Sequence, residues 1–381
     1  MRLLHIISSI DPHGGGPIEG IKQRGLFLQA LGHQVEVLCL DDPIQPWVDT
    51  FVLPVHAIGP SWKGYAYNRH ISPWLREHAR AYDHIIIHGM WQHHGHATAS
   101  TLRHMGIPYH VFTHGMLDPW FKHTYPLKHL KKWLYWLAAE YHVLRHARSV
   151  LFTSEEERLR ARESFWLYDA KEQVVPYGTT PPPDDHEFYA QQFFQMHPDL
   201  QDKQLLLYLS RIHPKKGCNL LIEAFARTAS AQPRAHLLLA GPGDPDTISQ
   251  LKAQAQRCGI AHRITWLGML RDENKWAAFH AASVFILPSH QENFGIAVAE
   301  ALGCGLPVLI SDKINIWREI NADGAGLIGP DTINGTISIL NRWFALDAAE
   351  QAKMSQAAKN CFRTRYTVAA MAHGLISAME F

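Results

Sequence analysis

The sequence has neither a long hydrophobic run nor a paired cysteine motif. No apolar stretch approaches the roughly 20 residues that a membrane-spanning helix needs. The five cysteines lie far apart and form no Cys-x-x-Cys pair, which argues against a zinc ribbon or a thioredoxin-type site. A sparse, odd set of thiols fits a reducing compartment, so we expect a cytoplasmic protein that can still touch a membrane surface.

An excess of charge is also lacking. The 381 residues include 36 Lys and Arg against 35 Asp and Glu, so bulk charge gives no reason to expect nucleic-acid binding. The apolar segment Met1–Ile10 runs into Asp11–Gly14 without a small-residue cleavage site, which indicates a buried strand rather than a signal peptide. Hydrophobic residues make up 46% of the chain, and its length predicts two or three domains.

Short apolar runs alternate with helical patterns along the whole chain. Helices such as Ile18–Leu31 and Asn68–Ala81 separate the runs, and Ser154–Glu157 fits a capping box that opens a further helix. This alternation favours parallel sheets covered by helices on both faces. The predicted strands are Leu3–Ser9, Val35–Leu40, His84–His88, Tyr109–Thr113, Val150–Thr153, Leu205–Ser210, His236–Ala240, Ile264–Leu267, Val284–Pro288 and Pro307–Ser311.

The best domain boundary lies at the proline-rich segment Val174–Pro183, because three prolines in a row cannot sit inside a helix or a central strand. We therefore predict an α/β fold of two doubly wound, Rossmann-like domains, at residues 1–177 and 178–364. A C-terminal helix, residues 365–381, is expected to return to the first domain. Ligands bind at the carboxyl ends of strands in such sheets, so the expected site is the cleft between the domains.

Two loops at predicted strand ends suit an anionic ligand. Gly14-Gly15-Gly16 precedes a helix and lets the backbone approach a phosphate, although a plain strand-to-helix turn explains it equally well. Arg211 and Lys216 follow the first strand of the second half, where an Arg can hold a diphosphate as a fork and a Lys adds a point charge. The alternative for this loop is a solvated basic turn.

Two carboxylates flank another glycine turn. The segment Ser289–Gly295 follows a predicted strand and precedes the helix Ile296–Gly303, so its backbone N–H groups would face an anion. Glu292 lies before this helix, where the helix dipole favours a carboxylate. Glu300 lies inside an otherwise apolar helix and needs a partner, either a nearby cation or a ligand hydroxyl.

Histidines are abundant, with 26 in the chain. His114 follows the predicted strand Tyr109–Thr113 and is a hydrogen-bond donor, a base or a spectator. The histidines at positions 88, 93, 94 and 96 fit no common zinc spacing, so we expect no metal there and place this segment at the acceptor cleft instead.

In their order along the chain, these elements resemble the retaining glycosyltransferases of the GT-B fold, and family 4 in particular. Glu292 and Glu300 have the Glu-x7-Glu spacing of that group. One departure lies at the domain junction, where the family often has Asn before the glycine and Asp soon after it, whereas this chain has Tyr177 and Thr179-Thr180. The other matching motifs are Gly14–Gly16, His114, Pro176–Gly178, Arg211 with Lys216-Gly217, Gly241–Gly243, Trp266–Gly268 and Glu300–Val308.

The resemblance implies a role for each position. Arg211 and Lys216 would hold the donor diphosphate, which Gly15 and Gly16 would approach from the other domain. Glu300 would contact the ribose and Glu292 the donor sugar, while His114 would lie near the sugar C6 and the reacting centre. The remaining donor-binding positions are Gly241, Leu267 and Met269 at the base pocket, Asn293, and Phe294, Gly295 and Ile296 with their backbone N–H groups.

The implied reaction moves a sugar from a nucleoside-diphosphate sugar to a saccharide or lipid-linked acceptor, as in exopolysaccharide, capsule or lipopolysaccharide assembly. Arg211, Lys216 and the helix start at Gly295 would neutralise the charge growing on the leaving diphosphate. No Asp-x-Asp motif stands where a metal would be held, so neither a metal nor a cofactor is expected. Same-face attack is favoured over a covalent intermediate on Glu292, because the family carboxylate is thought to bind sugar hydroxyls.

The segment Lys122–Arg148 holds six cations and one acid, Glu140. Leucines recur in it at helical spacing, and we expect this stripe to pack into the first domain. The remaining face, with its lysines, Trp133 and Trp136, would then meet anionic lipid. An ordinary surface helix is the alternative.

Two rival classes remain open. A two-domain protein that only binds a sugar would release no nucleoside diphosphate when incubated with donor and acceptor. Among enzymes of the same fold, the spacing of Glu292 and Glu300 counts against an epimerase, and the absence of a cofactor-anchoring lysine motif counts against a phosphorylase. The donor base, the donor sugar and the acceptor are not determined by the sequence.

Overall fold

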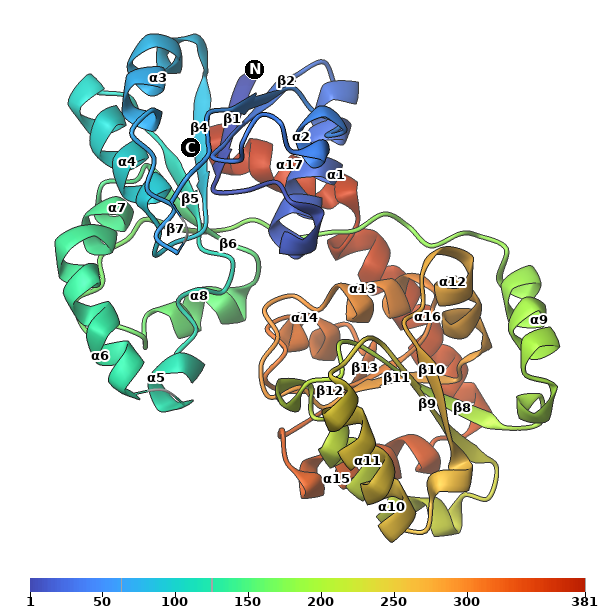
Figure 1. The fold of residues 1–381 in the computed structure, drawn as a ribbon. Helices are drawn as coiled ribbons and strands as arrows, with labels where there is room; N and C mark the ends of the chain where they lie inside the picture. Colours follow the sequence, from blue (N-terminus) through green and yellow to red (C-terminus); the bar gives the residue numbers. More distant parts are fainter. Residues whose placement is uncertain (63, 125, 381) are drawn as a thin grey trace. The chain divides into compact units, whose positions relative to one another are not determined.

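The protein folds into two compact α/β units, as seen in a computed structural model that describes residues 1–62, 64–124 and 126–380. Unit 1 comprises Met1–Gly178 and Val368–Phe381, and unit 2 comprises Thr179–Thr367. The C-terminal helix α17 (Val368–Glu380) therefore belongs to unit 1, and Figure 1 shows it beside α1 (Gly16–Ala30).

Unit 1 is built on a parallel sheet of seven strands in the order β3-β2-β1-β4-β5-β6-β7. The sequence predicted the five central strands but missed β3 and β7, which are only three residues long and lie at the two edges. The strands are β1 Arg2–Ile7, β2 Gln34–Cys39, β3 Val55–Ala57, β4 His84–His88, β5 His110–Phe112, β6 Ser149–Phe152 and β7 Glu172–Val174.

Helices cover both faces of this sheet, because successive side chains of a strand point to opposite faces. Leu4 and Ile6 of β1 join one hydrophobic cluster, whereas Leu3 and Ile7 join the other, to which α17 contributes Leu375. The helices of unit 1 are α1, α2 Pro46–Asp49, α3 Ile71–His78, α4 His93–Met105, α5 Trp120–Thr124, α6 Pro126–Tyr135, the π-helix η3 Trp136–Glu140, α7 Tyr141–Arg145, α8 Glu155–Ala161 and α17, with 3-10 turns η1 Pro12–Gly14 and η2 Ala79–Ala81.

Unit 2 contains a parallel sheet of six strands in the order β10-β9-β8-β11-β12-β13. All its predicted strands are present, whereas β13 was missed, since two of its four residues are glycines. The doubly wound prediction is confirmed in both units. The strands are β8 Gln204–Leu209, β9 Ala235–Ala240, β10 Ile264–Gly268, β11 Val284–Leu287, β12 Val308–Ser311 and β13 Gly326–Gly329.

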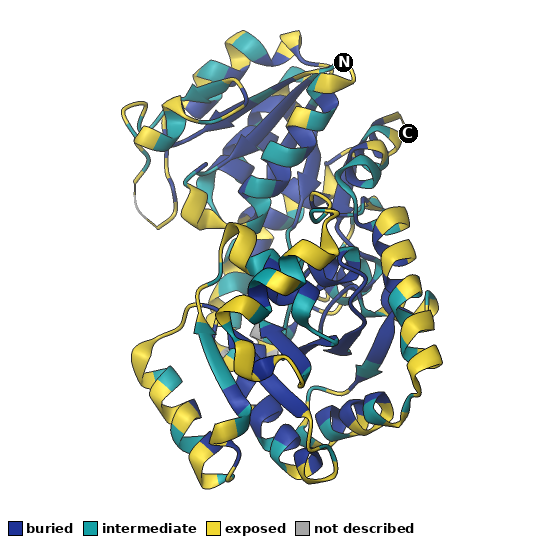
Figure 2. Cartoon of the chain, turned by 90° about the vertical axis from the view of Figure 1, so that its right-hand side faces the viewer, coloured by how far each residue is buried: buried dark blue, intermediate teal, exposed yellow. Residues whose placement is uncertain are grey.

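The strands of unit 2 are mostly buried between helices, except for the half-buried edge strand β10, as the mainly dark blue strands and partly yellow helices of Figure 2 show. None of the helices that the structure describes is long and apolar enough to cross a membrane. The helices of unit 2 are α9 His186–Met196, α10 Cys218–Thr228, α11 Pro245–Arg257, α12 Asp272–Ala281, α13 Ile296–Gly303, α14 Trp317–Ala322, α15 Ile333–Ala345 and α16 Ala348–Arg365, with 3-10 turns η4 Pro198–Leu200, η5 Pro214–Lys216, η6 Ala229–Ala231 and η7 Ala261–Arg263.

Several histidines are buried in unit 1. Burial lowers the pKa of His94 and of His110 to about 4, and that of His5 to about 3. These side chains are neutral in the folded protein at neutral pH and titrate near 6.5 when unfolded. Between these values the unfolded chain binds more protons than the folded one, so the stability of unit 1 must fall as the pH drops below about 6.5.

We predict that His94→Gln makes the stability of unit 1 less sensitive to acid. Between about pH 6 and pH 5 the slope of the unfolding free energy against pH should fall by about 1.4 kcal/mol per pH unit, the contribution of one proton. Denaturant unfolding at the two pH values measures it. His104→Gln, at an exposed position of the same helix, should keep the parental slope. An unchanged slope in His94→Gln would contradict the assignment of a neutral, buried imidazole.

Candidate active site

The predicted site residues of unit 2 gather at one edge of its sheet. Arg211 follows β8, Gly241 follows β9, Met269 follows β10 and Glu292 follows β11, and these four strands are neighbours in the sheet. The carboxyl ends of parallel strands meet at one edge, where ligands of such folds bind. The four loops that the sequence analysis singled out therefore lie at the same edge of the unit 2 sheet.

An ion pair joins two of these loops. The ammonium group of Lys216, at the end of η5, contacts the carboxylate of Glu292. The Lys216 side chain is only 10% exposed and that of Glu292 is 24% exposed, so each charge has lost much of its water and depends on the other. Lys216 Nζ also lies 3.5 Å from the carbonyl oxygen of Gln291.

The loop that carries Lys216 is fitted closely against the end of β11. Gly217 has φ 68°, and a Cβ added there would lie 2.0 Å from the carbonyl oxygen of Pro288. The backbone N–H of His290 donates to the carbonyl of Lys215 at 2.7 Å, and the hydroxyl of Ser289 donates to the same carbonyl at 3.0 Å. The position of Lys216 is therefore set by backbone contacts on both sides of it.

Glu292 is held from its other side by the loop after β12. Its backbone N–H donates to the carbonyl of Lys313, and its carbonyl accepts from the N–H of Asn315, both at 3.0 Å. The Asn315 side chain, which is 1% exposed, donates to Asn293 Oδ1 at 3.1 Å. We missed Asn315 as a positioning residue, because no local motif connects it to a turn about twenty positions earlier in the chain.

The helix α13 begins where the sequence predicted it, directly after Gly295. This glycine has φ 80° and ψ 69° at the N-cap, and no described side chain caps the helix. The backbone N–H of Val298 already donates to the carbonyl of Gly295 at 2.8 Å, so the N–H groups of Ile296 and Ala297 are those that the helix start offers to an anion, which the helix dipole also favours.

Glu300 lies in the next turns of α13 and has a protein partner. Lys275 Nζ of α12 lies 2.8 Å from Glu300 Oε1. Burial raises the pKa of the Glu300 carboxyl, and the nearby Lys275 works against this rise. The sequence left two possible partners for Glu300, a nearby cation or a ligand hydroxyl. The structure shows the cation, and the contact with a ribose hydroxyl stays a prediction. No spacing rule relates Lys275 to Glu300, so sequence reasoning missed it.

The remaining unit 2 positions border the same edge of the sheet. Arg211 is exposed, and among the described residues its guanidinium has no ion pair. Gly241 must be glycine, because it has φ 137° and an added Cβ would lie 1.8 Å from the carbonyl oxygen of Ser210. Leu267 is half-buried and Met269 is 55% exposed, as a nucleoside-contacting surface requires.

In unit 1, His114 is the end of a chain of three imidazoles. His114 Nε2 lies 2.9 Å from His88 Nδ1, and His88 Nε2 lies 2.8 Å from His5 Nδ1. Burial, with a further contribution from Arg24, lowers the pKa of His114 to about 3, so the ring is neutral at neutral pH. A neutral His114 can donate or accept a hydrogen bond but carries no charge to the site.

The loop carrying His114 is clamped by a buried carboxylate. Glu157 Oε1 accepts from the hydroxyl of Thr113 at 2.7 Å and from the N–H of Gly115 at 2.6 Å. These bonds support the φ of 51° at His114, which is unusual for a residue other than glycine. Ser154 caps α8 as predicted, but the capping box is wrong, because Glu157 turns to this loop and not back to Ser154.

Gly15 and Gly16 also lie in unit 1, at the start of α1. Gly15 has φ 80°, and a Cβ added at either glycine would meet no described atom within 4 Å. The backbone here is open on its outer side, as close approach to a ligand requires. Their approach to a donor held by unit 2 stays a prediction, as does that of His114.

Two family models together match most of the chain. The model described as "Glycosyl transferase 4-like domain" matches residues 24–178, and the model described as "Glycosyl transferases group 1" matches residues 190–361. The chain is a family 4-like member of the GT-B glycosyltransferases.

The curated relatives align with only part of this glycosyltransferase. The D-inositol 3-phosphate glycosyltransferase of Jonesia denitrificans is 27% identical over 209 residues, which are 51% of this chain and 48% of the relative. The chain thus spans about half the length of that relative.

Solved structures share the fold over the whole length. Sucrose-phosphate synthase from Thermosynechococcus elongatus has a TM-score of 0.77 at 21% identity, covering 100% of this chain and 98% of that chain. HepE of Anabaena in complex with UDP-glucose has a TM-score of 0.73 at 19% identity, covering 100% and 99%. At such low identity these likenesses concern the fold alone.

Among the residues that the structure describes, no group of three or more His, Cys, Asp and Glu side chains gathers in a way that could hold a metal ion. This also applies to the histidines between positions 88 and 96. Two of them are used internally, since His88 bonds to His5 and His114, and His94 Nε2 lies 2.9 Å from the carbonyl oxygen of His88.

We predict that Gly217→Ala destabilises unit 2 more than Gly259→Ala does. Both glycines have φ close to 70°, so both substitutions carry the cost of about 1–2 kcal/mol for a left-handed alanine. Only Gly217 adds a clash with a backbone carbonyl, so its variant should lose clearly more stability in denaturant unfolding. Equal losses in the two variants would refute the close packing of the Lys216 loop.

Removing the partner of Glu300 should produce a pH-dependent defect. We expect Lys275→Met to destabilise unit 2 by about 2 kcal/mol near neutral pH, less than for a fully buried pair because Lys275 is partly exposed. The loss should shrink as the pH falls, because protonation of Glu300 removes the unpaired charge. Denaturant unfolding of Lys275→Met at two pH values tests this. The double variant Lys275→Met/Glu300→Gln, which has no unpaired carboxylate, should not show this pH dependence. A loss that is the same at both pH values would argue against the pair.

Proposed function

We propose that this chain transfers a sugar from a nucleoside-diphosphate sugar to a saccharide or lipid-linked acceptor, with retention of the anomeric configuration. The observation that carries the proposal is the Lys216–Glu292 ion pair beside the uncapped start of α13. A cation, free backbone N–H groups and a carboxylate lie together there, which are the groups that bind a diphosphate and sugar hydroxyls. One HepE structure is a complex with UDP-glucose, which makes UDP-sugars the first donors to test.

Donor binding would exchange the partners of this ion pair. The diphosphate offers Lys216 a stronger anion than one carboxylate, and the start of α13 receives the other phosphate oxygens. Glu292 then loses its cation and can accept hydrogen bonds from hydroxyls of the donor sugar. The empty site therefore keeps both charged groups paired until the donor arrives, without leaving either of them desolvated and alone.

Bond cleavage places new negative charge on the departing diphosphate. Lys216 and the helix start are already fixed by their backbone contacts, so they stabilise this charge without reorganising. Arg211, at the same sheet edge, adds an exposed guanidinium that would reach the outer phosphate. The acceptor hydroxyl would attack from the face that the diphosphate leaves and pass its proton to the departing diphosphate oxygen, which gives retention without a covalent intermediate on Glu292. No step in this scheme requires a metal ion or a cofactor.

The unit 1 residues would complete the site. Neutral His114 would donate to a donor sugar hydroxyl, and its chain to His88 and His5 would keep the ring orientation fixed. Gly15 and Gly16 would approach the diphosphate. All five cysteines have free thiols, and we propose a cytoplasmic enzyme that works in polysaccharide assembly. A sugar-binding protein without catalysis is the alternative, and turnover distinguishes the two.

Two substitutions at the ion pair test the proposal. A thermal-shift screen of nucleotide sugars first identifies the donor, because a bound ligand raises the unfolding temperature. Lys216→Met should weaken binding of both the free nucleoside diphosphate and the sugar donor, since it removes the diphosphate contact. Glu292→Gln should spare binding of the free nucleoside diphosphate and weaken only that of the sugar donor.

Release of nucleoside diphosphate with a donor and an acceptor measures turnover. Each variant should lose about 100-fold to 1,000-fold in kcat/KM, because the removal of a single group that stabilises charge in the transition state typically has an effect of this size. Arg227→Met, which breaks the exposed Arg227–Glu223 pair of α10, is the matched control and should retain parental activity. Near-parental turnover in a folded Lys216→Met or Glu292→Gln variant would refute the assignment of the site.

A further inference from the structure

The leucines of α6 face outward, which corrects the expectation that they pack into the domain. Leu127 is 83% exposed, Leu130 66%, Leu134 74%, and Leu137 of the following π-helix 47%. Their spacing of three and four positions puts them on one side of the helix, since an α-helix turns by about 100° per residue. We call these four side chains the leucine face. Four leucines exposed in a row form a continuous apolar surface, unlike single exposed residues.

The opposite side of this helix is fixed in the core. Trp136 is fully buried and stacks on Phe165 with ring centroids 4.2 Å apart, and its indole N–H donates to the carbonyl of Leu167 at 2.8 Å. Trp133 packs edge-on against Phe165 at 5.2 Å. A rotation that turned the leucines inward would remove both tryptophans from the core. The leucine face is therefore a stable feature of the folded unit.

The surroundings of the leucine face are basic and aromatic. Lys128 and Lys131 are exposed on the same helix, and the sequence contains no acidic residue from position 119 to position 139. The first acid after that stretch, Glu140, is 1% exposed, and its Oε1 accepts from the N–H of Trp91. Trp166 is 81% exposed and stacks beside Trp133 at 5.7 Å. The segment that carries Trp166 also has the exposed acids Glu163 and Asp169, so the surface without acids is that of α6 itself. A helix with exposed Leu and Lys side chains and no acids is typical of one that lies on an anionic lipid surface.

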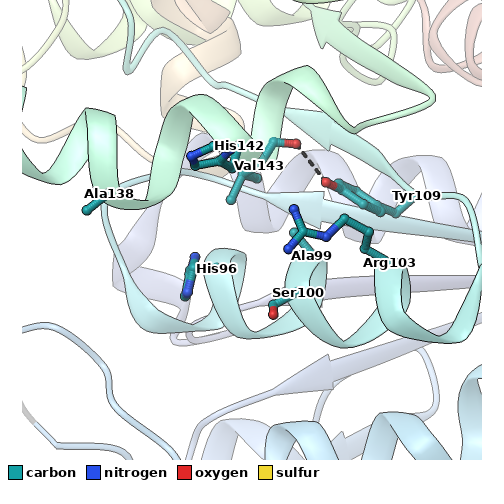
Figure 3. Close-up of a pocket in the computed structure, with 8 residues that line it drawn as sticks. All are labelled: His96, Ala99, Ser100, Arg103, Tyr109, Ala138, His142 and Val143. Carbon is teal, nitrogen blue, oxygen red and sulfur yellow. Dashed lines mark hydrogen bonds between the residues drawn. The ribbon is translucent and has the colours of Figure 1, made fainter.

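A basic cavity lies next to the end of the leucine face (Figure 3). It holds about 180 Å³ between α4 and the segment η3–α7, and it includes Ala138, which follows Leu137 directly. Figure 3 shows His96, Arg103 and His142 around it, together with the Ser100 hydroxyl. In the described part of the chain no carboxylate lines it. Arg103 gives the cavity a fixed positive charge, whereas burial lowers the pKa of His96. The anions that a lipid surface supplies are phosphate groups.

We propose that the leucine face docks on an anionic lipid bilayer, with its leucines in the acyl boundary and Lys128 and Lys131 among the headgroups. The basic cavity would then face the headgroup phosphates. Charge decides between lipid and a second copy of this chain, because pairing two such faces would bring like charges together. The docking does not depend on the proposed transfer reaction, and it would present the enzyme to a lipid-linked acceptor.

Vesicle co-sedimentation of the full chain tests this proposal. The parent should bind vesicles of phosphatidylcholine and phosphatidylglycerol, bind neutral phosphatidylcholine vesicles more weakly, and lose part of its binding in high salt. Lys128→Glu/Lys131→Glu should bind the anionic vesicles at least about 30-fold more weakly, at about fivefold per lysine. Leu130→Gln/Leu134→Gln should lose at least about tenfold on both vesicle types, because the apolar contribution does not depend on lipid charge.

Two matched controls should bind like the parent. Leu26→Gln/Leu31→Gln changes two leucines of α1 and the turn after it, which are 43% and 47% exposed, and Lys252→Glu/Lys353→Glu makes the same change of net charge on unit 2. Circular dichroism and the thermal shift with donor should be unchanged in all variants, which separates this test from that of the transfer reaction. A parent that ignores anionic vesicles, or equal binding by parent and α6 variants, would overturn the proposal. Self-association that is lost in Leu130→Gln/Leu134→Gln would assign the face to a second copy instead.

Discussion

The candidate site of unit 2 depends on one constraint, which is that a charge removed from water must have a partner. Lys216 and Glu292 lie on loops after different strands and satisfy this constraint for each other. Their pairing draws the loop after β8 against the loop after β11, where Gly217 is needed for the close backbone approach and Asn315 holds the turn of Glu292. Lys275 of α12 and Glu300 of α13 form a second ion pair of the same kind. A donor diphosphate would enter this network by replacing one of its anions.

Unit 1 contributes neutral groups where unit 2 contributes charged ones. Three imidazoles in line end at His114, and their burial keeps them without charge at neutral pH. Glu157, buried behind this loop, accepts hydrogen bonds from the hydroxyl groups of Thr113 and Thr153 and from the backbone N–H groups of Gly115 and Thr153, so both its oxygens are satisfied inside the unit. In the proposed reaction, such neutral groups would orient sugar hydroxyls, while the cations of unit 2 would be left to the donor diphosphate.

Local patterns in the sequence predicted the architecture and the positions of most loops of the candidate site, because buried parallel strands and the glycine turn before α13 have strong local signals. The edge strands β3 and β7 were missed because they are only three residues long, and β13 was missed because two of its four residues are glycines. Lys275 and Asn315 were missed because their partners are distant in sequence. The prediction of which face of α6 packs into the domain was wrong for a different reason. Leucines and tryptophans both recur there at helical spacing. Periodicity defines two faces, but it does not show that the tryptophan rings, which pack on Phe165, occupy the core.

The central claim is that a diphosphate binds between Lys216 and the start of α13. A crystal structure with UDP-glucose, or with the donor that the thermal-shift screen selects, tests it most directly. The account predicts phosphate oxygens within hydrogen-bond distance of Lys216 Nζ and of the backbone N–H groups at Gly295 and Ile296. It also predicts that Glu292 leaves Lys216 and contacts sugar hydroxyls. A nucleotide bound at the opposite edge of the unit 2 sheet, with the Lys216–Glu292 pair intact, would contradict it.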